Sequence, residues 1–154
     1  MLKLGLREYS ESWIWPQELT DFQSNPDKPN YWANTWALVR EQNFKGTNRF
    51  LIGADQAVQM HRWHRYTEFW QDAIVMLRAQ TDSLDALLEQ LIQTHAWNKQ
   101  DIEHWRSRVL VLDPVEASSS AIREALSDPT RRQNPINALD QSVHTYILEH
   151  GLYL

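Results

Sequence analysis

The sequence predicts an α/β fold built on a parallel sheet, and three observations support this prediction. Short apolar runs recur at 49–53, 73–77 and 109–113, each with the length of a buried strand. Segments with the helical spacing of apolar residues separate or follow these runs, as expected where helices connect parallel strands. Of the 154 residues, 42% are hydrophobic and 23% are charged, which provides enough apolar surface for a core.

The first third of the chain alternates between short structured segments and turns. Residues 1–9 carry leucines at positions 2, 4 and 6, a pattern too short to distinguish a helix from an extended segment. Residues 13–19 are expected to form a strand followed by a loop, and 24–30 is a dense cluster of turn-forming residues. An amphipathic helix is predicted over 32–43, with a stop signal at 45–46.

The remaining two thirds of the sequence predict helices between and after the apolar runs. Helical patterns fill 82–94 and 99–107, and two more follow the last run at 119–126 and 140–149. Gly151 is the stop signal of the last helix. No repeat, low-complexity segment or domain boundary is visible, so we expect a single domain over residues 1–154.

Composition and charge exclude several classes of function. The net charge of −5 gives no general basic field, which argues against sequence-independent binding of nucleic acid or anionic lipid. The lack of cysteine excludes disulfide frameworks, thiolate nucleophiles and cysteine-ligated zinc sites. No apolar run approaches membrane-spanning length and no signal-peptide core is visible, so we expect a cytoplasmic protein without nucleic-acid or membrane partners. The oligomeric state stays open, and a homo-oligomer is one alternative.

Two stretches follow predicted strands, at places where open parallel sheets gather ligands because free N–H groups point at anions. After the first strand, Gly53 allows close backbone approach and Asp55 could accept hydrogen bonds from ribose hydroxyls; the alternative is a turn that only caps a helix. After the third strand, the serines at 118–120 and the guanidinium of Arg123 could converge on phosphate. The alternative there is a serine cap with a surface arginine.

A third stretch, residues 61–66, combines an indole with cationic side chains. The spacing of His61 and His64 allows a metal site, but the sequence supplies no third ligand nearby, and we predict no protein-held metal. An aromatic ring flanked by cations suits stacking on a flat, negatively charged ligand, for which Trp63 is the candidate. Packing of Trp63 against the edge of the sheet is the alternative.

In their order and spacing these stretches resemble the signature of bacterial nicotinate-nucleotide adenylyltransferases. Residues 50–56 (FLIGADQ) and 62–65 (RWHR) are similar to the family's IGADQ and RWHR motifs. Residues 117–123 resemble its ISSTxIR phosphate motif, with Ala117 for isoleucine and Ser120 for threonine. Weaker similarities are to PSYTxxTL at 29–36, to MLxLA at 1–4 and to YI…HGLY at 146–153, so the resemblance runs with gaps from Met1 to Tyr153.

The resemblance implies a Rossmann-like nucleotidyltransferase with helices on both faces of the sheet. It implies transfer of the adenylyl group of ATP to nicotinate mononucleotide in NAD biosynthesis, with Mg²⁺ carried by ATP. The acceptor nucleotide is assigned to Trp63, whose indole stacks on the pyridine ring, and to Tyr31, Trp32, Thr35 and His64. ATP is assigned to Gly53, Asp55, Ser118, Ser119, Ser120 and Arg123. Trp32 stands where the family usually has threonine, and His61 where it often has proline.

One motif of the family, GxFxPxHxGH, is absent, because none of the six histidines is spaced as HxGH. In the family that loop supplies much of the charge neutralisation as the mononucleotide phosphate attacks the α-phosphorus of ATP. We therefore expect no catalytic residue within 1–154 and little adenylyl transfer by this chain alone. Since Met1 aligns with an internal methionine of the family, we expect the C-terminal two thirds of the family fold, from a reading frame that begins late. The alternatives are a non-catalytic nucleotide- or partner-binding remnant, or an enzyme acting on pantetheine phosphate or nicotinamide mononucleotide.

Overall fold

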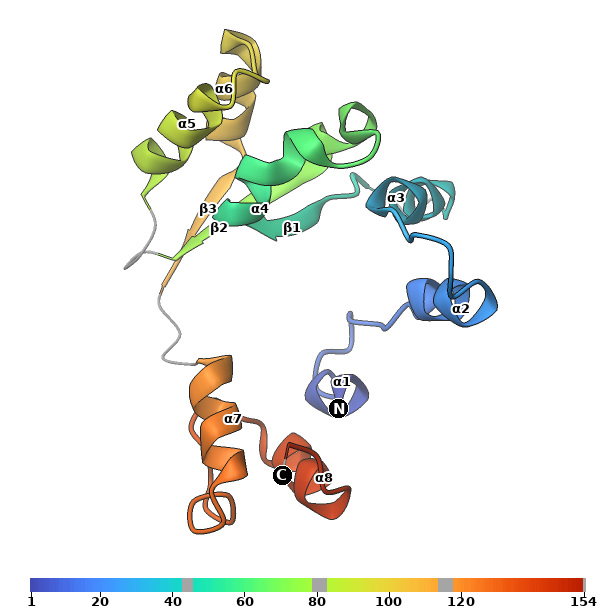
Figure 1. Ribbon diagram of the computed structural model, residues 1–154, viewed down its shortest axis with the longest axis vertical. Coiled ribbons are helices and arrows are strands. Elements are labelled where there is room, and N and C mark those ends of the chain that lie inside the picture. The colour runs from blue at the N-terminus through green and yellow to red at the C-terminus, as the bar shows by residue number, and fades with distance from the viewer. Residues whose placement is uncertain (43–45, 79–82, 114–117, 154) are drawn as a thin grey trace. The chain divides into compact units, whose positions relative to one another are not determined.

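The computed structural model describes residues 1–42, 46–78, 83–113 and 118–153. The chain divides into two compact units (Figure 1). Residues Gln17–Pro114 form the sheet unit, and Met1–Pro16 together with Val115–Leu154 form the terminal unit. The expected single domain over 1–154 stays a prediction. Asn43, Lys45, Asp82 and Ala117, which the sequence analysis used as helix limits or motif positions, lie outside the described residues.

The sheet unit is built on three parallel strands in the order β1-β2-β3, which confirms the predicted α/β class (Figure 1). The strands are β1 (Phe50–Gly53), β2 (Ala73–Arg78) and β3 (Val109–Leu112), each within one residue of its apolar run at either end. Ile52 pairs with Val75, and Val75 pairs with Val109, so the three side chains share one face of the sheet.

Helices precede, connect and follow the strands of the sheet unit. They are α2 (Gln17–Ser24), α3 (Trp32–Glu41), α4 (Ala54–Gln59), α5 (Leu84–Gln93) and α6 (Lys99–Ser107), with short 3₁₀ turns η1 (Met60–Arg62), η2 (Tyr66–Glu68) and η3 (Trp70–Asp72). Side-chain caps account for where two of them begin. The Ser83 side chain accepts a hydrogen bond from the N–H of Ala86 at the start of α5, and Asn98 forms a capping box with Asp101 at the start of α6.

The predicted strand over 13–19 is wrong. No strand is assigned there, and α2 begins at Gln17, directly after Pro16. Glu18 lies in the first turn of α2, where the helix dipole favours a negative charge, and its carboxylate accepts a 2.7 Å hydrogen bond from Thr35 of α3. The alternation of aromatic and apolar residues at 13–15 instead brings Trp13 and Trp15 within 6.4 Å of each other.

The core of the sheet unit lies against one face of the sheet. Phe50, Ile52, Ala73, Val75 and Leu77 are buried on this face, and they join the buried parts of α3, α5 and α6 in one cluster. The pleat turns the intervening residues to the opposite face, where Leu51 is 57% exposed and Leu110 is 48% exposed. Two tryptophans beyond the strands, Trp70 and Trp105, complete the buried aromatic part of the cluster.

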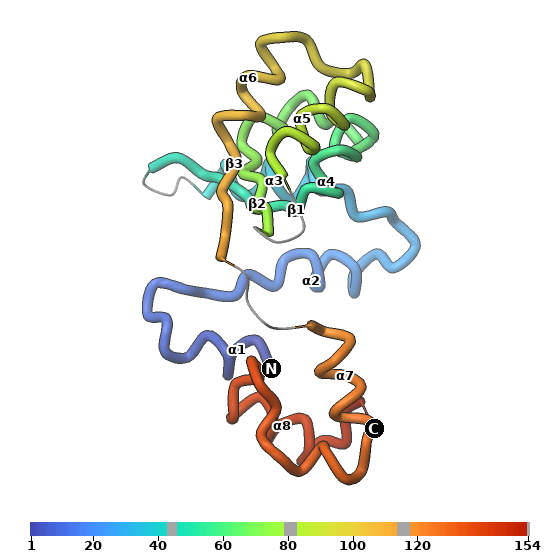
Figure 2. Tube along the Cα trace, turned by 90° about the vertical axis from the view of Figure 1, so that its left-hand side faces the viewer, coloured from blue at the N-terminus to red at the C-terminus, as the bar shows by residue number. Residues whose placement is uncertain are grey.

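The described residues of the terminal unit form the helices α1 (Leu2–Gly5), α7 (Ser119–Ser127) and α8 (Gln141–Glu149). Helices α7 and α8 confirm the predicted helices at 119–126 and 140–149. Contacts between α1 and α8 join the two ends of the chain (Figure 2). The buried side chains are few and include Leu126 of α7 with His144 and Ile147 of α8. His144 donates a 2.7 Å hydrogen bond from Nε2 to the carbonyl of Arg132, which ties the loop between α7 and α8 to the core.

Helix ends in the terminal unit follow the sequence signals. Asp140 precedes α8 and accepts hydrogen bonds from the N–H groups of Ser142 and Val143. Gly151 has φ +59°, a left-handed conformation that glycine adopts without steric cost, and the helix ends two residues earlier. None of the described helices is both long and apolar enough to cross a bilayer.

Candidate functional site

In the turn that follows β1, the backbone of Gly53 and the side chain of Asp55 lie close together. Gly53 ends the strand in an extended conformation and precedes α4. A Cβ atom on Gly53 would lie 2.7 Å from Oδ1 of Asp55, closer than real Cβ contacts, so this position requires glycine as long as Asp55 keeps its orientation. No side chain caps α4, and the exposed Asp55 carboxylate accepts a 3.1 Å hydrogen bond from Gln56. The capping alternative for Asp55 therefore has no hydrogen bond to support it in this structure.

Trp63 is placed by the 3₁₀ turn η1 and is half-buried. Its backbone turns to an extended conformation directly after Arg62, and its ring packs beside Phe69 with the centroids 6.3 Å apart. Phe69 is buried in the core, so part of the indole serves packing. Because Trp63 is only half-buried, its remaining surface is open to a ligand, and both sequence interpretations stay compatible with its position.

His64 and Arg65 connect the Trp63 segment to the beginning of α3. The imidazole of His64 stacks on Tyr31, the residue preceding α3, with the ring centroids 4.2 Å apart at 28°. Arg65 has φ 55° and ψ 33°, a left-handed conformation that costs roughly 1–2 kcal/mol for a residue with a Cβ. Its guanidinium reaches Asn34 of α3 at 3.5 Å.

Glu68 binds the guanidinium of Arg65 in a bidentate ion pair. Nε of Arg65 donates to Oε1 of Glu68 at 2.7 Å, and Nη2 donates to Oε2 at 2.6 Å. The hydrogen bond from Arg65 is the main cause that lowers the pKa of Glu68 below its ordinary value. The same hydrogen bond, together with the negative charge of Glu68, raises the pKa of Arg65.

Two other residues that the resemblance assigns to the acceptor make packing contacts. Trp32 lies with its ring centroid 5.2 Å from Phe50 and 5.9 Å from Trp36, and its indole N–H is buried without an acceptor in the described part of the chain. Thr35 is buried and donates its hydroxyl to Glu18. The structure thus brings His64 to Tyr31, while Trp32 and Thr35 face neighbours within the sheet unit.

The histidine pair at 61 and 64 is not gathered with further ligands. His61 donates from Nδ1 to the carbonyl of Val58 at 2.9 Å, and His64 is stacked on Tyr31. Within the described ranges no three His, Cys, Asp or Glu side chains come together in a way that could hold a metal ion.

The serines predicted to bind phosphate begin α7 in the terminal unit. Ser118 precedes the helix and accepts a 3.4 Å hydrogen bond from the N–H of Ala121, so it acts as a cap, as the alternative interpretation expected. Ser119, Ser120 and Arg123 are exposed. No carboxylate of the described residues lies within ion-pair distance of Arg123, which leaves its guanidinium open to an anion.

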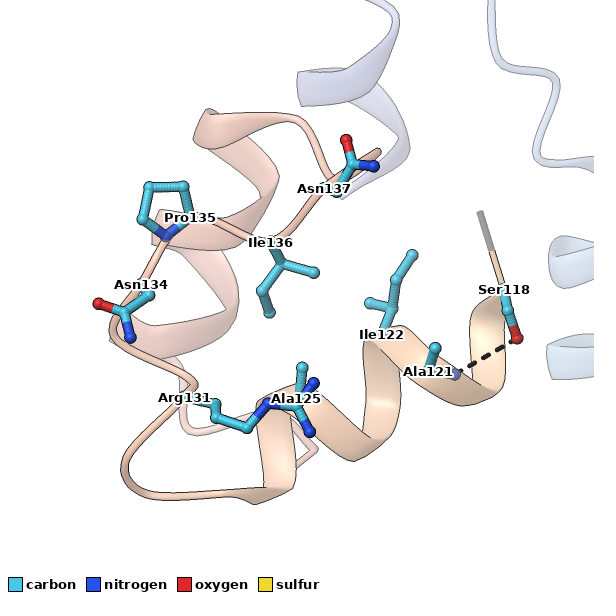
Figure 3. A pocket seen from close by; sticks show the side chains of 9 residues that line it. All are labelled: Ser118, Ala121, Ile122, Ala125, Arg131, Asn134, Pro135, Ile136 and Asn137. Atoms are coloured by element: carbon cyan, nitrogen blue, oxygen red, sulfur yellow. Dashed lines mark hydrogen bonds between the residues drawn. The ribbon is translucent and has the colours of Figure 1, made fainter. Parts of the chain in front are cut away.

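A pocket of about 330 Å³ lies beside α7, between the helix and the loop that follows it (Figure 3). The side chains of Ile122 and Ile136 extend into the space between helix and loop, and Ser118 and Arg131 also line it. Arg131 is 3.7 Å from Glu124, a loose and exposed ion pair. The pocket adjoins the first turn of α7 but was not anticipated from the sequence.

Sequence reasoning also missed the hub that fixes α3 to the sheet. Asp72, in η3, accepts hydrogen bonds from Trp36 Nε1 at 2.9 Å, Arg40 at 2.5 Å and Arg49 at 3.0 Å. These donors precede Asp72 by 36, 32 and 23 residues, so no local pattern announces the cluster. The i,i+3 spacing of Arg65 and Glu68 was visible in the sequence, whereas the left-handed backbone of Arg65 was not.

Comparison with known proteins shows similarity to curated bacterial proteins that each carry the name probable nicotinate-nucleotide adenylyltransferase. The relative from Idiomarina loihiensis is 28% identical over 142 residues, which cover 87% of this chain and 66% of the relative. The relative from Aeromonas salmonicida is 30% identical over 135 residues (82% and 61%), and that from Neisseria meningitidis is 28% identical over 125 residues (80% and 57%). The chain thus spans less than two thirds of the length of these relatives. No family model matches the chain.

Proposed function

We propose that this chain, a relative of bacterial nicotinate-nucleotide adenylyltransferases, carries substrate-binding parts of an enzyme that transfers the adenylyl group of ATP to nicotinate mononucleotide. The products are nicotinate adenine dinucleotide and pyrophosphate, a step of NAD biosynthesis. The observation that carries the proposal is the similarity to relatives of that name over 80–87% of this chain. The described site supports it with a half-buried indole and an exposed aspartate that follow the same strand, β1.

The acceptor nucleotide is assigned to the segment around Trp63. The half-buried indole offers ring surface to the pyridine, since stacking on an aromatic side chain is worth about 1–3 kcal/mol per base. His64, stacked on Tyr31, adds a side chain that can carry positive charge next to the indole, which suits the anionic nicotinate better than the neutral nicotinamide. Trp32 and Thr35 contribute through the α3 segment whose packing they fix.

ATP is assigned to two places, one in each unit. Gly53 and Asp55 follow β1, where the exposed carboxylate can accept hydrogen bonds from ribose hydroxyls. Ser118, Ser119, Ser120 and Arg123 begin α7, where hydroxyl groups, a helix N-terminus and a guanidinium favour phosphate.

Magnesium fits this proposal as an ion carried by the triphosphate. The described residues gather no cluster of carboxylates or histidines for it, whereas the phosphate oxygens supply hard oxygen ligands. When bound it would neutralise charge on the phosphates. The residues of this chain hold and orient the two nucleotides so that a phosphate oxygen of the mononucleotide faces the α-phosphorus, and pyrophosphate leaves.

A variant of Trp63 tests the acceptor assignment on the 154-residue chain. Nicotinate mononucleotide and Mg-ATP are titrated separately by calorimetry into the unmodified chain and into Trp63→Ala. We expect Trp63→Ala to weaken the mononucleotide by about tenfold, because stacking of about 1–3 kcal/mol is lost, and to leave ATP unchanged. Trp13→Ala, which removes a 58% exposed indole from the terminal unit, is the matched control.

Equal affinity for the mononucleotide in Trp63→Ala and Trp13→Ala would remove Trp63 from the acceptor site. A lower melting temperature of Trp63→Ala with both nucleotides weakened together would show that the indole serves packing alone. Absence of mononucleotide binding by the unmodified chain would contradict the proposed acceptor.

The second candidate is a non-catalytic nucleotide-binding remnant. Both candidates bind ATP, and they differ in what happens when the acceptor is present. If the chain binds the mononucleotide, and adenylyl transfer is measured once a separate polypeptide supplies the GxFxPxHxGH motif, the chain is part of an enzyme. A chain that binds ATP but not the mononucleotide would be the remnant.

A further inference from the structure

The pairing of Glu68 with Arg65 has no role in the assignments above. We propose that Glu68 is a positioning residue for the acceptor nucleotide: by holding Arg65 in its left-handed turn, it keeps His64 against Tyr31 and fixes how Trp63 is presented. This inference rests on the proposed function, because Trp63 is taken as the residue that contacts the nucleotide.

Arg65 adopts a left-handed backbone conformation. A residue with a Cβ avoids φ 55°, and arginine has no short polar side chain that stabilises this conformation locally, as asparagine has. Something else in the structure must therefore hold the turn. The two hydrogen bonds from Arg65 to Glu68 fix the guanidinium in one orientation three residues further along the chain, which closes the segment 65–68 into a tight loop.

The segment 65–68 orients its neighbours His64 and Trp63. Arg65 also reaches Asn34 at 3.5 Å, and its neighbour His64 stacks on Tyr31, so two adjacent residues attach the segment to the beginning of α3. On the other side, Trp63 is held by Phe69, which follows Glu68 directly. A change in the direction of the chain at Arg65 would therefore alter the contacts of His64 and Trp63 together.

Glu68 is not suited to contact the nucleotide itself. Both carboxylate oxygens are already engaged by Arg65, and a negative charge would repel an anionic nucleotide. The pKa of Glu68 is lowered, with the hydrogen bond from Arg65 as the main cause, so the carboxylate stays ionised at neutral pH and the ion pair persists there. The charge of Arg65 is thus balanced by Glu68, which assigns both side chains to holding the turn.

The substitution Glu68→Gln tests the proposal, because it keeps the size of the side chain and removes its charge. Calorimetric titration of the 154-residue variant should show about fivefold weaker binding of nicotinate mononucleotide, the upper end for an exposed ion pair, with ATP unchanged. Glu103→Gln is the matched control: Glu103 and Arg106 form another i,i+3 pair, 62% and 47% exposed, on α6. The control should bind both nucleotides as the unmodified chain does.

A second variant separates positioning from charge. Glycine adopts positive φ without cost, so Arg65→Gly should keep the turn without help from Glu68. The double variant Arg65→Gly with Glu68→Gln should therefore recover the mononucleotide affinity that Glu68→Gln loses. NMR gives a readout without ligand: the upfield shift that Tyr31 imposes on the His64 ring protons should shrink in Glu68→Gln and stay in Glu103→Gln.

The outcomes distinguish this inference from the proposed function. If the unmodified chain does not bind the mononucleotide, the proposed function and this inference both fall. If it binds and Glu68→Gln binds equally well, only the positioning role is overturned. A double variant as weak as Glu68→Gln, or an unchanged His64 shift in Glu68→Gln, would likewise overturn it.

Discussion

The sheet unit and the terminal unit are stabilised by different means. In the sheet unit, Trp36, Trp70 and Trp105 lie in a core that packs against one face of the sheet, and side chains far apart in sequence bind one another. The terminal unit buries little more than Leu126, His144 and Ile147, and its Trp13 is 58% exposed. Its helices depend instead on local caps. The contrast predicts that substitutions reaching a core will affect the sheet unit most, and that the terminal unit will respond more to pH.

The largest effect is expected for Trp105→Ala. Trp105 is fully buried, with its ring centroid 5.4 Å from those of both Trp70 and Trp97, so its removal leaves a large cavity. The loss should be about 3–5 kcal/mol of unfolding free energy. Urea unfolding measures it, and amide hydrogen exchange shows where it acts. Protection should fall in the sheet unit and persist in α7 and α8; an equal loss in both units would show that they unfold as one body.

A smaller effect is expected when the hub at Asp72 is altered. Asp72→Asn keeps the shape of the side chain but replaces one acceptor oxygen by a donor facing Trp36 and two arginines. Loss of charged hydrogen bonds should cost about 1–3 kcal/mol in urea unfolding. Glu89→Gln, on the exposed side of α5, removes the same charge and should change little. If Asp72→Asn and Glu89→Gln have the same free energy of unfolding, the hydrogen bonds of Asp72 do not contribute to the difference between the sheet unit and the terminal unit.

The smallest effect at neutral pH, and the clearest dependence on pH, is expected for Asp140. Hydrogen bonds from the side chain and N–H of Ser142 and the N–H of Val143 lower its pKa in the folded chain. The unfolded chain therefore takes up the proton at higher pH than the folded chain. The stabilisation that the ionised Asp140 carboxylate gives to the folded chain is complete above the ordinary pKa of aspartate. It is lost as the pH falls through the lower pKa of Asp140 in the folded chain.

Asp140→Asn isolates this titration, because asparagine also caps helices but does not ionise. At pH 7 the variant should melt close to the unmodified chain. Between neutral and acidic pH, the melting temperature of α8, followed by NMR, should fall less in the variant than in the unmodified chain. A parallel fall in both would place the acid sensitivity elsewhere, for example at Asp128, whose pKa is lowered mainly by the hydroxyl of Thr130.

The fold could be predicted from the sequence where local patterns determine it. The strands at Phe50–Gly53, Ala73–Arg78 and Val109–Leu112 coincide with short apolar runs, which are typical of strands in parallel sheets, although only one face of this sheet is buried. The prediction failed at 13–19, where an aromatic alternation resembles a strand but Pro16 and the acidic first turn start a helix at Gln17. The hub at Asp72 was out of reach, since its donors lie more than twenty residues away.

The candidate site shows the same division. The motifs containing Gly53, Asp55 and Trp63 could be recognised as linear segments, whereas the stacking of His64 on Tyr31 is visible only in the folded chain. The half-burial of Trp63 depends on its packing against Phe69, and the positive φ of Arg65 accompanies its ion pair with Glu68. Neither contact can be predicted from composition. The roles of all these residues, and of the serines on α7, stay predictions that binding measurements decide.

The packing of Trp70, Trp97 and Trp105 also gives the chain an optical signature. Their ring centroids lie 4.8 to 5.4 Å apart at fixed, non-parallel angles, so the electronic transitions of the three indoles couple. The ultraviolet circular dichroism of the protein should therefore contain a strong coupled band that comes mainly from the sheet unit, since the terminal unit adds one more distant pair, Trp13 and Trp15, with ring centroids 6.4 Å apart. This band offers a label-free way to follow the folding of the sheet unit during ligand titrations, without attaching a probe to either nucleotide.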